Sequence, residues 1–500
     1  METTRDVVVV GAGIAGLTAA ALLARAGLAV TLLEAHHQSG GCAGTFRRGL
    51  YTFDVGATQV AGLEPGGIHE RLCRHLEIPL PEATPLDPAC VVDLDDGRPA
   101  ISLWRNPHRW QEERQEQFPG SERFWKLCNS LHQTNWRFAG KDPVLPPRSL
   151  WDLGQLLGAV DGATLASSLL TSASMADLLR LCGCDQDGRL RRFLDLQLRL
   201  YSQEPADRTA ALYGATVLSM AQEPLGLWHL EGSMQVLSTC MERALTTSGG
   251  TLQRRHRVRR LERLGERWRV EGIKGKHDHF QMQSRDVVLA IPPQTLPSLL
   301  GEQLPVGYRR RLCEFPDPSG ALVLYAAVDR DQLPPDTPSH RQLDWHDPGS
   351  LFVSISQEGD GRAPRRQATV IASVFTDARP WFSLEPEAYA AAKTGAQTGI
   401  VRGLQRLLGV RTDAWLHQEL ATPRSFARWS GRPYGFVGGL GQRPRCFGPF
   451  GLASRTPLPG LWLCGDSIHP GEGTAGVSVS ALMACRQLLA QRGEALTLES

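Results

Sequence analysis

The sequence predicts an α/β fold, and three observations support this prediction. A β-branched run at residues 6–10 leads directly into GAGIAG, residues 11–16, and then into a helix-like segment. Residues 28–35, LAVTLLEA, form a second strand-like run whose last polar residue is Glu34. Near the other end of the chain, an apolar run at residues 461–464 leads into another glycine-rich turn. Because 500 residues are too many for one simple core, we expect two domains.

The composition argues against several classes of protein. The chain has 54 Lys and Arg against 52 Asp and Glu, a net charge of +2, so bulk electrostatics do not indicate a nucleic-acid partner. No stretch approaches the roughly 18 consecutive apolar residues of a membrane-spanning helix, and the N-terminus has no secretory signal pattern. The 11 cysteines are scattered without paired CxxC motifs. We therefore expect a cytoplasmic protein with reduced thiols and no metal site.

The glycines of the first turn have separate roles. Gly11 allows the tight turn, Gly13 lets a pyrophosphate approach the backbone, and Gly16 lets the helix pack closely on the strand. The carboxylate of Glu34 can accept hydrogen bonds from ribose hydroxyls, and its charge would repel the 2′-phosphate of NADP. Strand, turn, helix, second strand and acidic residue together predict a dinucleotide site, which these residues alone leave open between FAD and NAD.

A second glycine cluster follows Glu34 closely. Gly40, Gly41 and Gly44 lie within five residues, which would let a longer dinucleotide run through a narrow channel. The sequence FDVGAT, residues 53–58, places small residues after a strand, where a flat ring could approach the main chain. His36 and His37 lack a partner at metal-binding spacing, so we interpret them as part of a solvated loop.

These motifs resemble those of a known family. GAGIAG with Glu34, SGGCAGT, FDVGAT and CGDSIHPGEGTAGV are similar to motifs of the FAD-binding amine oxidase and phytoene desaturase superfamily. The resemblance spans both ends of the chain. It implies a Rossmann-type FAD-binding domain of the glutathione reductase type, interleaved with an α+β substrate domain. FAD-contacting positions carried over by motif are Gly11, Gly13, Ile14, Ala15, Gly16, Glu34, Gly40, Gly41, Cys42, Gly44, Thr45, Gly56, Ala57, Thr58, Val258, Gly465, Asp466, Gly473, Thr474, Gly476 and Val477.

Within that superfamily the sequence most resembles the carotenoid desaturases. Residues 460–480 share their C-terminal signature, including His469-Pro470-Gly471, but depart from it at Asp466, Ile468, Glu472 and Thr474. The segments FDVGATQVAGLEPGGIH, FLDLQLRLYSQ and GLWHLEGSMQVLS are similar to the C-3′,4′ desaturases of photosynthetic bacteria, which act in carotenoid glycoside biosynthesis. Carotenoid cis-trans isomerases are similar as well.

The resemblance also implies how the chain is divided. We expect a discontinuous FAD-binding domain at residues 1–80, 231–293 and 456–495, and a carotenoid-binding domain at residues 81–230 and 294–455. Residues 232–247 are predicted to be a helix, and residues 251–264 a strand that passes the adenine at Val258. The arginines of this strand, Arg254, Arg255, Arg257, Arg259 and Arg260, fit a solvated face better than a contact with anionic lipid. Residues 286–293 are predicted to be the strand that returns the chain to the substrate domain.

The substrate segments are rich in tryptophan, which has two interpretations. Trp104, Trp110, Trp125, Trp136 and Trp151 fit an ordinary core. They also fit an apolar tunnel for a polyene, whose rim would lie at a membrane surface. A carotenoid resides in lipid, so we expect peripheral membrane association of the protein.

The resemblance implies a desaturase in which hydride passes from the substrate to FAD, with oxygen or a quinone as electron acceptor. A catalytic base is not identifiable, because Glu64, Glu204 and His229 each fit a structural role better. A carotenoid isomerase with reduced FAD, or a flavin-fold binding protein without turnover, remain alternatives. Amine oxidation is disfavoured, since Trp429, Tyr434 and Phe436 precede the C-terminal turn and the turn itself carries His469-Pro470 instead of an aromatic pair.

Overall fold

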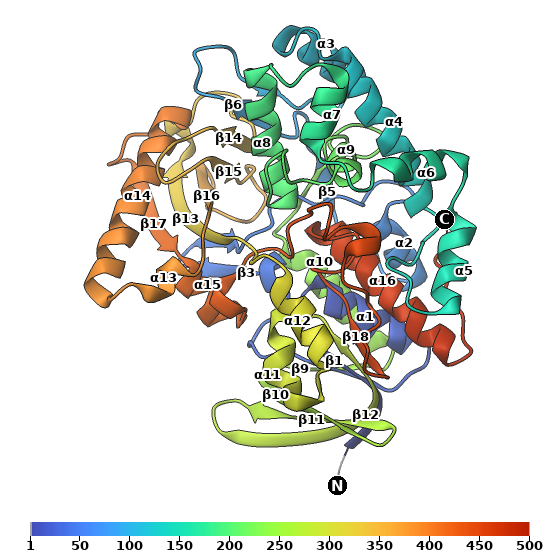
Figure 1. The fold of residues 1–500 in the computed structure, drawn as a ribbon. Helices are drawn as coiled ribbons and strands as arrows, with labels where there is room; N and C mark the ends of the chain where they lie inside the picture. Colours follow the sequence, from blue (N-terminus) through green and yellow to red (C-terminus); the bar gives the residue numbers. More distant parts are fainter. Residues whose placement is uncertain (1–2, 500) are drawn as a thin grey trace.

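A seven-stranded mixed sheet forms one half of the protein, whose computed structural model describes residues 3–499 (Figure 1). Its strand order is β10-β11-β12-β1-β2-β9, and β18 pairs with β12. The pairings β2-β1, β1-β12, β12-β18 and β2-β9 are parallel. The strands are β1 (Thr3–Val10), β2 (Val30–Leu33), β9 (Thr251–Gln253), β10 (His256–Leu264), β11 (Arg267–Lys274), β12 (Asp278–Leu289) and β18 (Leu461–Leu463).

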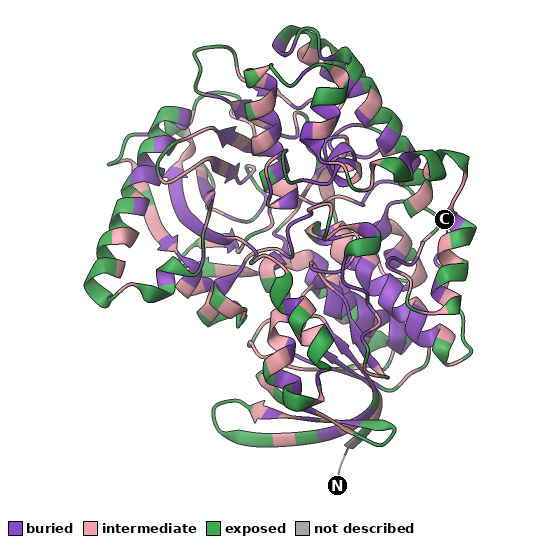
Figure 2. Ribbon diagram, in the orientation of Figure 1, coloured by how far each residue is buried: buried purple, intermediate pink, exposed green. Residues whose placement is uncertain are grey.

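Helix α1 (Ile14–Arg25) lies at the centre of this half, and every residue from Ile14 to Ala24 is buried. Its run of alanines lets two helices pack closely against it, α10 (Gln235–Thr247) and α16 (Gly473–Gln491). Helix α2 (Ile68–His75) completes this core. Figure 2 shows the buried residues concentrated in α1 and in the strands beneath it.

A second seven-stranded sheet, of order β17-β13-β16-β15-β14-β6-β7, lies in the other half. Along β13, Leu322, Leu324, Ala326 and Val328 pack toward the core that includes α14 (Pro386–Leu408), whereas Ala321, Val323 and Tyr325 face the opposite way. This period-two alternation gives the sheet one face toward a helix and one toward the interior of the protein. The strands are β6 (Val91–Asp93), β7 (Ile101–Ser102), β13 (Gly320–Asp329), β14 (His340–Leu343), β15 (Leu351–Ile355), β16 (Gln367–Thr376) and β17 (Trp415–Ala421).

Helices cover the remaining sides. Trp110 and Trp125 are buried in one helical core with Phe118, Phe124 and Phe193, as the core interpretation predicts. The helices of this region are α3 (Pro107–Gln117), α4 (Glu122–Ala139), α5 (Leu150–Ala159), α6 (Gly162–Ser167), α7 (Met175–Cys182), α8 (Gly188–Ser202) and α9 (Ala211–Val217). Elsewhere the chain forms α11 (Leu296–Leu300), α12 (Val306–Glu314), α13 (Pro380–Ser383), α15 (Pro423–Ser430) and the short strand pairs β3 (Thr45–Arg48) with β4 (Tyr51–Asp54) and β5 (Ala83–Pro85) with β8 (Trp228–Leu230).

The prediction of one strand over residues 251–264 was wrong. The chain breaks at Arg254 and Arg255, where Arg255 has a φ of +59°, so β9 pairs with β2 while β10 pairs with β11 at the far edge of the sheet. Of the strand predicted at residues 286–293, only residues 286–289 are strand, as the end of the longer β12, and residues 290–293 lie beyond it. The strands of the first sheet all fall within the three predicted FAD-domain segments, and the domain boundaries themselves stay a prediction.

Within residues 3–499, no single helix has the length and hydropathy to cross a bilayer. The helical segments at residues 150–159 and 162–170 pass that test only as a pair, and they are bent by 103° with respect to each other.

Candidate functional site

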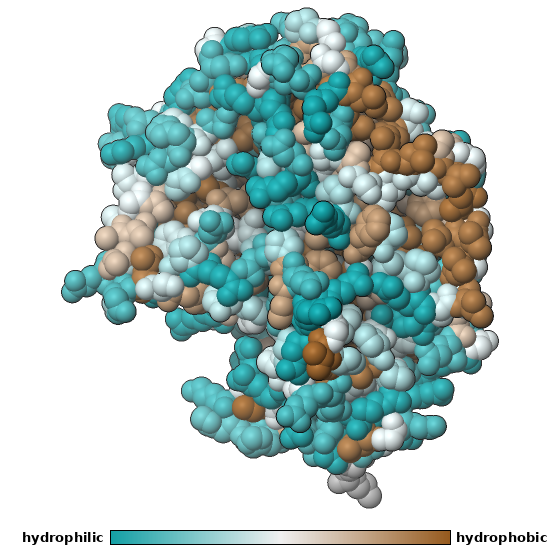
Figure 3. Space-filling view, in the orientation of Figure 1, coloured by the Kyte–Doolittle hydropathy of each residue, from teal (hydrophilic) through white to brown (hydrophobic). Residues whose placement is uncertain are grey.

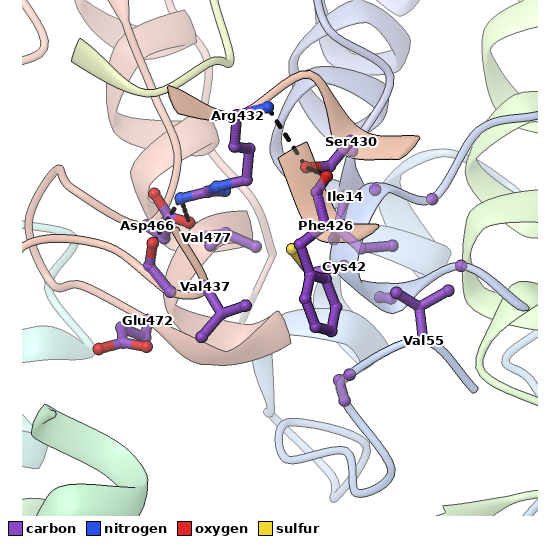
Figure 4. Close-up of a pocket in the computed structure, with 18 of the residues that line it drawn as sticks. Ile14, Cys42, Val55, Phe426, Ser430, Arg432, Val437, Asp466, Glu472 and Val477 are labelled. Atoms are coloured by element: carbon purple, nitrogen blue, oxygen red, sulfur yellow. Dashed lines mark hydrogen bonds and ion pairs between the residues drawn. The ribbon is translucent and has the colours of Figure 1, made fainter. Parts of the chain in front are cut away.

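A cavity of about 1370 Å³ lies between the two halves (Figure 4). Its lining comes from the three glycine-rich segments around residues 11–15, 40–44 and 465–477, from α8, α9 and α15, and from the inward face of β13. A pocket for one drug-sized ligand typically measures roughly 300–1,000 Å³. The cavity can therefore hold a large ligand together with a second one.

The first glycine turn connects β1 to α1 at one wall of this cavity. A Cβ atom on Gly16 would overlap the carbonyl oxygen of Gly11, so the helix can approach the strand only with glycine there. A Cβ on Gly13 would meet nothing within 4 Å, because that position faces open space. No side chain caps the start of α1, so its first amides stay available. This end of the helix suits a phosphate group.

Both carboxylate oxygens of Glu34 are fixed by the backbone at the edge of the cavity. Oε2 accepts a hydrogen bond of 2.7 Å from the amide of Ala12, and Oε1 accepts one of 2.7 Å from the amide of His36. Each oxygen retains further acceptor capacity. The side chain is thus oriented as an acceptor for hydroxyl groups, such as those of a ribose.

The second glycine cluster packs directly on the first turn. The amide of Gly40 donates to the carbonyl of Ala12 at 2.8 Å, and a Cβ on Gly41 would lie 3.3 Å from the Cα of Gly13. Gly44 then accepts a hydrogen bond from the amide of Val55, which brings residues 56–58 to the cavity wall. The two turns therefore form one continuous channel.

The third glycine turn, at the C-terminal end of the chain, reaches the same edge of the sheet because β18 pairs with β12 and β12 pairs with β1. The amide of Gly465 donates to Ser480 Oγ at 2.7 Å, which ties this turn to α16. Helix α16 begins at Gly473 with no side-chain cap, and a Cβ on Gly473 would meet nothing within 4 Å. The start of a second helix thus faces the cavity, where it favours a group that carries or develops negative charge.

Four polar side chains from distant segments meet beside this third turn. Arg432 Nη2 lies 2.8 Å from Asp466 Oδ2, and Gln203 Nε2 donates to Glu472 Oε1 at 2.8 Å. Figure 4 shows Arg432 directed toward Asp466, with Glu472 on the same side and Cys42 across the space. Asp466 and Glu472 lie six residues apart in the third turn. Gln203 and Arg432 come from segments more than 20 residues away from that turn and from each other.

Burial determines how these groups titrate. It raises the pKa of the Glu472 carboxyl well above its ordinary value, and the nearby Asp466 carboxylate adds to the increase. Burial also raises the pKa of the Cys42 thiol, although Arg432 partly opposes that shift. Burial by itself lowers the pKa of Arg432, but the carboxylates of Asp466 and Glu472 raise it overall. Glu472 therefore holds its proton more tightly than an ordinary glutamate.

The residues present fit a dinucleotide. Two uncapped helix starts face the cavity, and the positions of Gly13 and Gly473 leave open space where a side chain would project. Two buried nitrogens of cavity-lining residues, Arg432 Nε and His36 Nε2, have no hydrogen-bond partner among the described residues. Unpartnered buried donors at such a wall are suited to a polar ligand.

Away from the polar cluster much of the cavity lining is apolar, with Arg199 and Gln342 among its polar side chains. The phenol of Tyr213 donates to the carbonyl of Tyr201 at 2.6 Å, so its polar end is already satisfied. Ala321 and Val323 contribute from β13. Apolar side chains of the helical region and of the second sheet line this part: Leu196, Leu200, Val217, Met220, Leu227 and Phe352.

Most of the predicted cofactor positions line the cavity, and Gly16 does not, since it packs against Gly11. Sequence reasoning missed Arg432, which no motif marks, and it noticed Glu472 only as a departure from the desaturase signature. The prediction that His36 and His37 belong to a solvated loop was wrong for His36, which is half-buried at the cavity wall near Trp429.

The other candidate residues lie away from the cavity lining. Glu64 accepts a hydrogen bond from the amide of Gly62, Glu204 pairs with Arg443, and His229 bonds to Asp360. The five tryptophans of residues 104–151 do not line the cavity either, so they contribute no tunnel wall. Among residues 3–499, no group of three or more His, Cys, Asp or Glu side chains could hold a metal ion.

The three aromatic residues that could frame an amine substrate, Trp429, Tyr434 and Phe436, do not come together at the cavity wall. Trp429 lines the cavity beside His36, at the end marked by Glu34. Tyr434 contacts Phe382 edge to face outside the cavity lining, and Phe436 is buried. These three rings therefore do not flank the C-terminal turn as a pair.

Comparison with known proteins agrees with this geometry. The profile of the flavin containing amine oxidoreductases matches residues 14–489. The chain is 25% identical over 521 residues to a chloroplastic prolycopene isomerase of Arabidopsis thaliana, covering 98% of this chain and 84% of the relative. It is also 25% identical to a hydroxyneurosporene desaturase of Cereibacter sphaeroides, covering 97% of both. The structure of a putrescine oxidase variant superposes with a TM-score of 0.66 at 18% identity, covering 98% of this chain and 100% of the other, which supports the fold.

Proposed function

Because the chain belongs to the flavin-containing amine oxidoreductase family, we propose that it is an FAD-dependent carotenoid desaturase. It introduces a C=C bond at the C-3′,4′ position of an acyclic-ended, 1′-hydroxylated carotenoid, in carotenoid glycoside biosynthesis. One observation carries the proposal: the channel built by the glycine turns continues without a break into an apolar pocket. A polyene needs such a pocket, whereas a charged substrate would need a polar partner there.

The cofactor is FAD, and we assign its parts to residues by their chemistry. The amides at the start of α1, with Gly11 and Gly13, would receive the pyrophosphate. Glu34 would accept hydrogen bonds from the ribose of the adenosine, and Val258 would contact the adenine. The start of α16 and the residues around Cys42, Gly56 and Asp466 would hold the flavin ring.

When bound, FAD supplies the acceptor for a hydride from the substrate. The chain's own residues would align the polyene through the mainly apolar side chains that α8, α9 and β13 contribute to the cavity wall. The Tyr213 hydroxyl and Arg432 Nη2 are held by protein groups, the carbonyl of Tyr201 and the carboxylate of Asp466. Burial disfavours the charged form of the Glu472 carboxyl at this wall. As the C=C bond forms, the substrate would lose a hydride to the bound FAD and a proton from the neighbouring carbon to solvent water.

A carotenoid cis-trans isomerase is the second candidate function, since relatives named prolycopene isomerase match 98% of the chain. The same channel and apolar pocket serve that reaction, which involves no net oxidation. Both kinds of relative are 25% identical to this chain and match at least 97% of it, so the comparisons support the two functions equally. We put the desaturase first because of the segments FDVGATQVAGLEPGGIH, FLDLQLRLYSQ and GLWHLEGSMQVLS, which resemble the C-3′,4′ desaturases.

Anaerobic mixing separates the two functions. The purified, flavin-loaded protein is mixed without oxygen with a 1′-hydroxylated acyclic-ended carotenoid, and the visible flavin absorbance is recorded. Desaturation bleaches the oxidised flavin in one turnover, and either oxygen or a quinone then restores the colour and identifies the acceptor. An isomerase leaves the oxidised flavin unbleached and converts substrate only after prior reduction, an outcome that contradicts the desaturase proposal.

A further inference from the structure

The surface over α5 and α6 has an unusual distribution of side chains, which we call the leucine surface. Leu150 and Leu169 are 89% and 87% exposed. Figure 3 shows apolar atoms running down the side of the molecule where Figure 1 places α4, α6 and α5. The exposed leucines of this surface are Leu150, Leu153, Leu157, Leu165 and Leu169.

The polar side chains of α5 face inward, which reverses the usual pattern of a surface helix. Asp152 is fully buried and lies 3.5 Å from Arg455 Nε. Gln155 accepts a hydrogen bond of 2.6 Å from Arg486 Nη2. Because these contacts hold the polar side of α5 against the protein, the leucines on its other side are fixed outward.

The geometry of the two helices is rigid enough to hold this face. Ser149 caps α5 by accepting from the amide of Asp152, and Asp161 caps α6 by accepting from the amide of Thr164 at 2.8 Å. Lys141 Nζ donates to the carbonyl of Ala159 at 3.0 Å and so fixes the end of α5. The two helical segments are bent by 103° with respect to each other, and each carries exposed leucines.

Charge around the leucine surface selects the kind of partner. Residues 150–170 contain no Lys or Arg, and their two carboxylates, Asp152 and Asp161, are buried or used as a cap. Exposed cationic side chains flank the segment, of which Arg180 pairs with Asp177 and Lys141 donates to the carbonyl of Ala159: Arg137, Lys141, Arg148 and Arg180. An apolar centre with a basic border matches the acyl chains and anionic headgroups of a lipid bilayer.

We propose that the leucine surface docks the protein on an anionic lipid bilayer, with α5 and α6 lying in the headgroup layer. This inference rests on the proposed function, because a carotenoid substrate is dissolved in lipid and must be collected there. The basic flanks set the orientation, and the leucines contribute the apolar insertion.

The test uses the flavin-loaded protein and vesicles of phosphatidylcholine with phosphatidylglycerol, separated by flotation. The docking variant carries Leu150→Ser, Leu157→Ser and Leu169→Ser. The matched control carries Val306→Ser, Leu416→Ser and Leu264→Ser, which replace exposed apolar residues elsewhere. Thermal unfolding and the flavin spectrum are recorded to check that both variants are folded.

We expect the wild type and the control to float with the vesicles. The affinity of the docking variant for the vesicles should fall at least about tenfold. Wild-type protein that stays at the bottom, or a docking variant that floats like the wild type, overturns the proposal. Light scattering adds a further check on the oligomeric state. If the wild type is a dimer that binds no vesicles, and the leucine substitutions dissociate this dimer, the partner of the leucine surface is a second copy of the chain and the docking proposal is overturned.

The same variants separate this inference from the proposed function. Desaturation is measured with substrate in detergent, where no bilayer is needed. A docking variant that is active in detergent and fails on vesicles supports the docking surface. If the wild type binds vesicles but converts no carotenoid in detergent, the docking proposal stands and the proposed desaturase function is refuted.

Discussion

Gln203 Nε2 donates a 2.8 Å hydrogen bond to Glu472 Oε1, and this contact joins the end of α8 to the residue that precedes α16. Gln203 has a φ of +61° and its side-chain oxygen accepts from the amide of Ser319. One side chain therefore connects the helical region, the second sheet and the third glycine turn. The position of Glu472 at the cavity depends on all three.

We expect Glu472→Gln to stabilise the flavin-free protein at pH 8 and to change little at pH 5. Burial raises the pKa of Glu472 in the folded state, so the unfolded state releases this proton first as pH rises above about 4.5. The wild type thus loses stability with rising pH, and glutamine, which keeps the acceptor for Gln203, removes that loss. Urea unfolding at both pH values measures it, with Glu494→Gln at an exposed position as the control. An equal effect of Glu472→Gln at pH 5 and pH 8 would argue against a buried protonated carboxyl.

Arg432→Met is expected to destabilise the protein by about 2 kcal/mol or more and to weaken flavin retention. The change leaves Asp466 without the partner that lies 2.8 Å away in a largely buried place. Adding Asp466→Asn removes the unpaired charge and recovers part of the stability. A double-mutant cycle by urea unfolding gives the coupling free energy, and a value near zero would mean that the pair is not coupled.

Filling the apolar part of the cavity is expected to block conversion without loss of flavin. Leu200→Trp and Met220→Trp place large rings where the polyene should lie. Conversion should fall at least about tenfold, while the flavin content per chain stays at the wild-type value. Leu50→Trp, on an exposed turn outside the cavity lining, is the matched control. Full activity of both cavity variants would place the substrate elsewhere.

The buried His69 predicts a loss of stability as pH falls. Burial lowers its pKa to about 4, and neither ring nitrogen has a partner. Between pH 6.5 and about 4 the unfolded chain binds a proton that the folded protein excludes, so stability is complete above pH 6.5 and decreases below it. His69→Leu should remove up to about 3 kcal/mol of this decrease, as measured by urea midpoints at pH 7.5 and 4.5. The exposed His277→Leu should leave the slope unchanged; an equally shallow slope in both variants would contradict the assignment.

The flavin-binding half was the most predictable from sequence, because its glycines have local causes. Gly16 lies five positions after Gly11, and the overlap that a Cβ on Gly16 would create is chiefly with the carbonyl of Gly11. The meeting of the third turn with the first was implied by family resemblance, whereas the physical reason, β18 pairing with β12 and β12 with β1, is visible only in the fold.

The polar cluster and the apolar pocket could not be predicted in this way. Arg432 reaches Asp466 because a loop after α15 returns to the third turn, a long-range contact that no local pattern encodes. The break at Arg255 was missed because an arginine with positive φ has no sequence signal. The tryptophans indicated apolar packing correctly, but the cavity is lined instead by leucines of α8 and by β13.

The most direct test is the mass and retention time of the product formed in cells that accumulate a 1′-hydroxylated, acyclic-ended carotenoid. The wild type is compared with Gly13→Glu, whose side chain would occupy the open space at the start of α1. We expect a product lighter by two hydrogens, formed by the wild type and absent with the variant. A product of unchanged mass and altered retention would contradict desaturation and establish the isomerase instead.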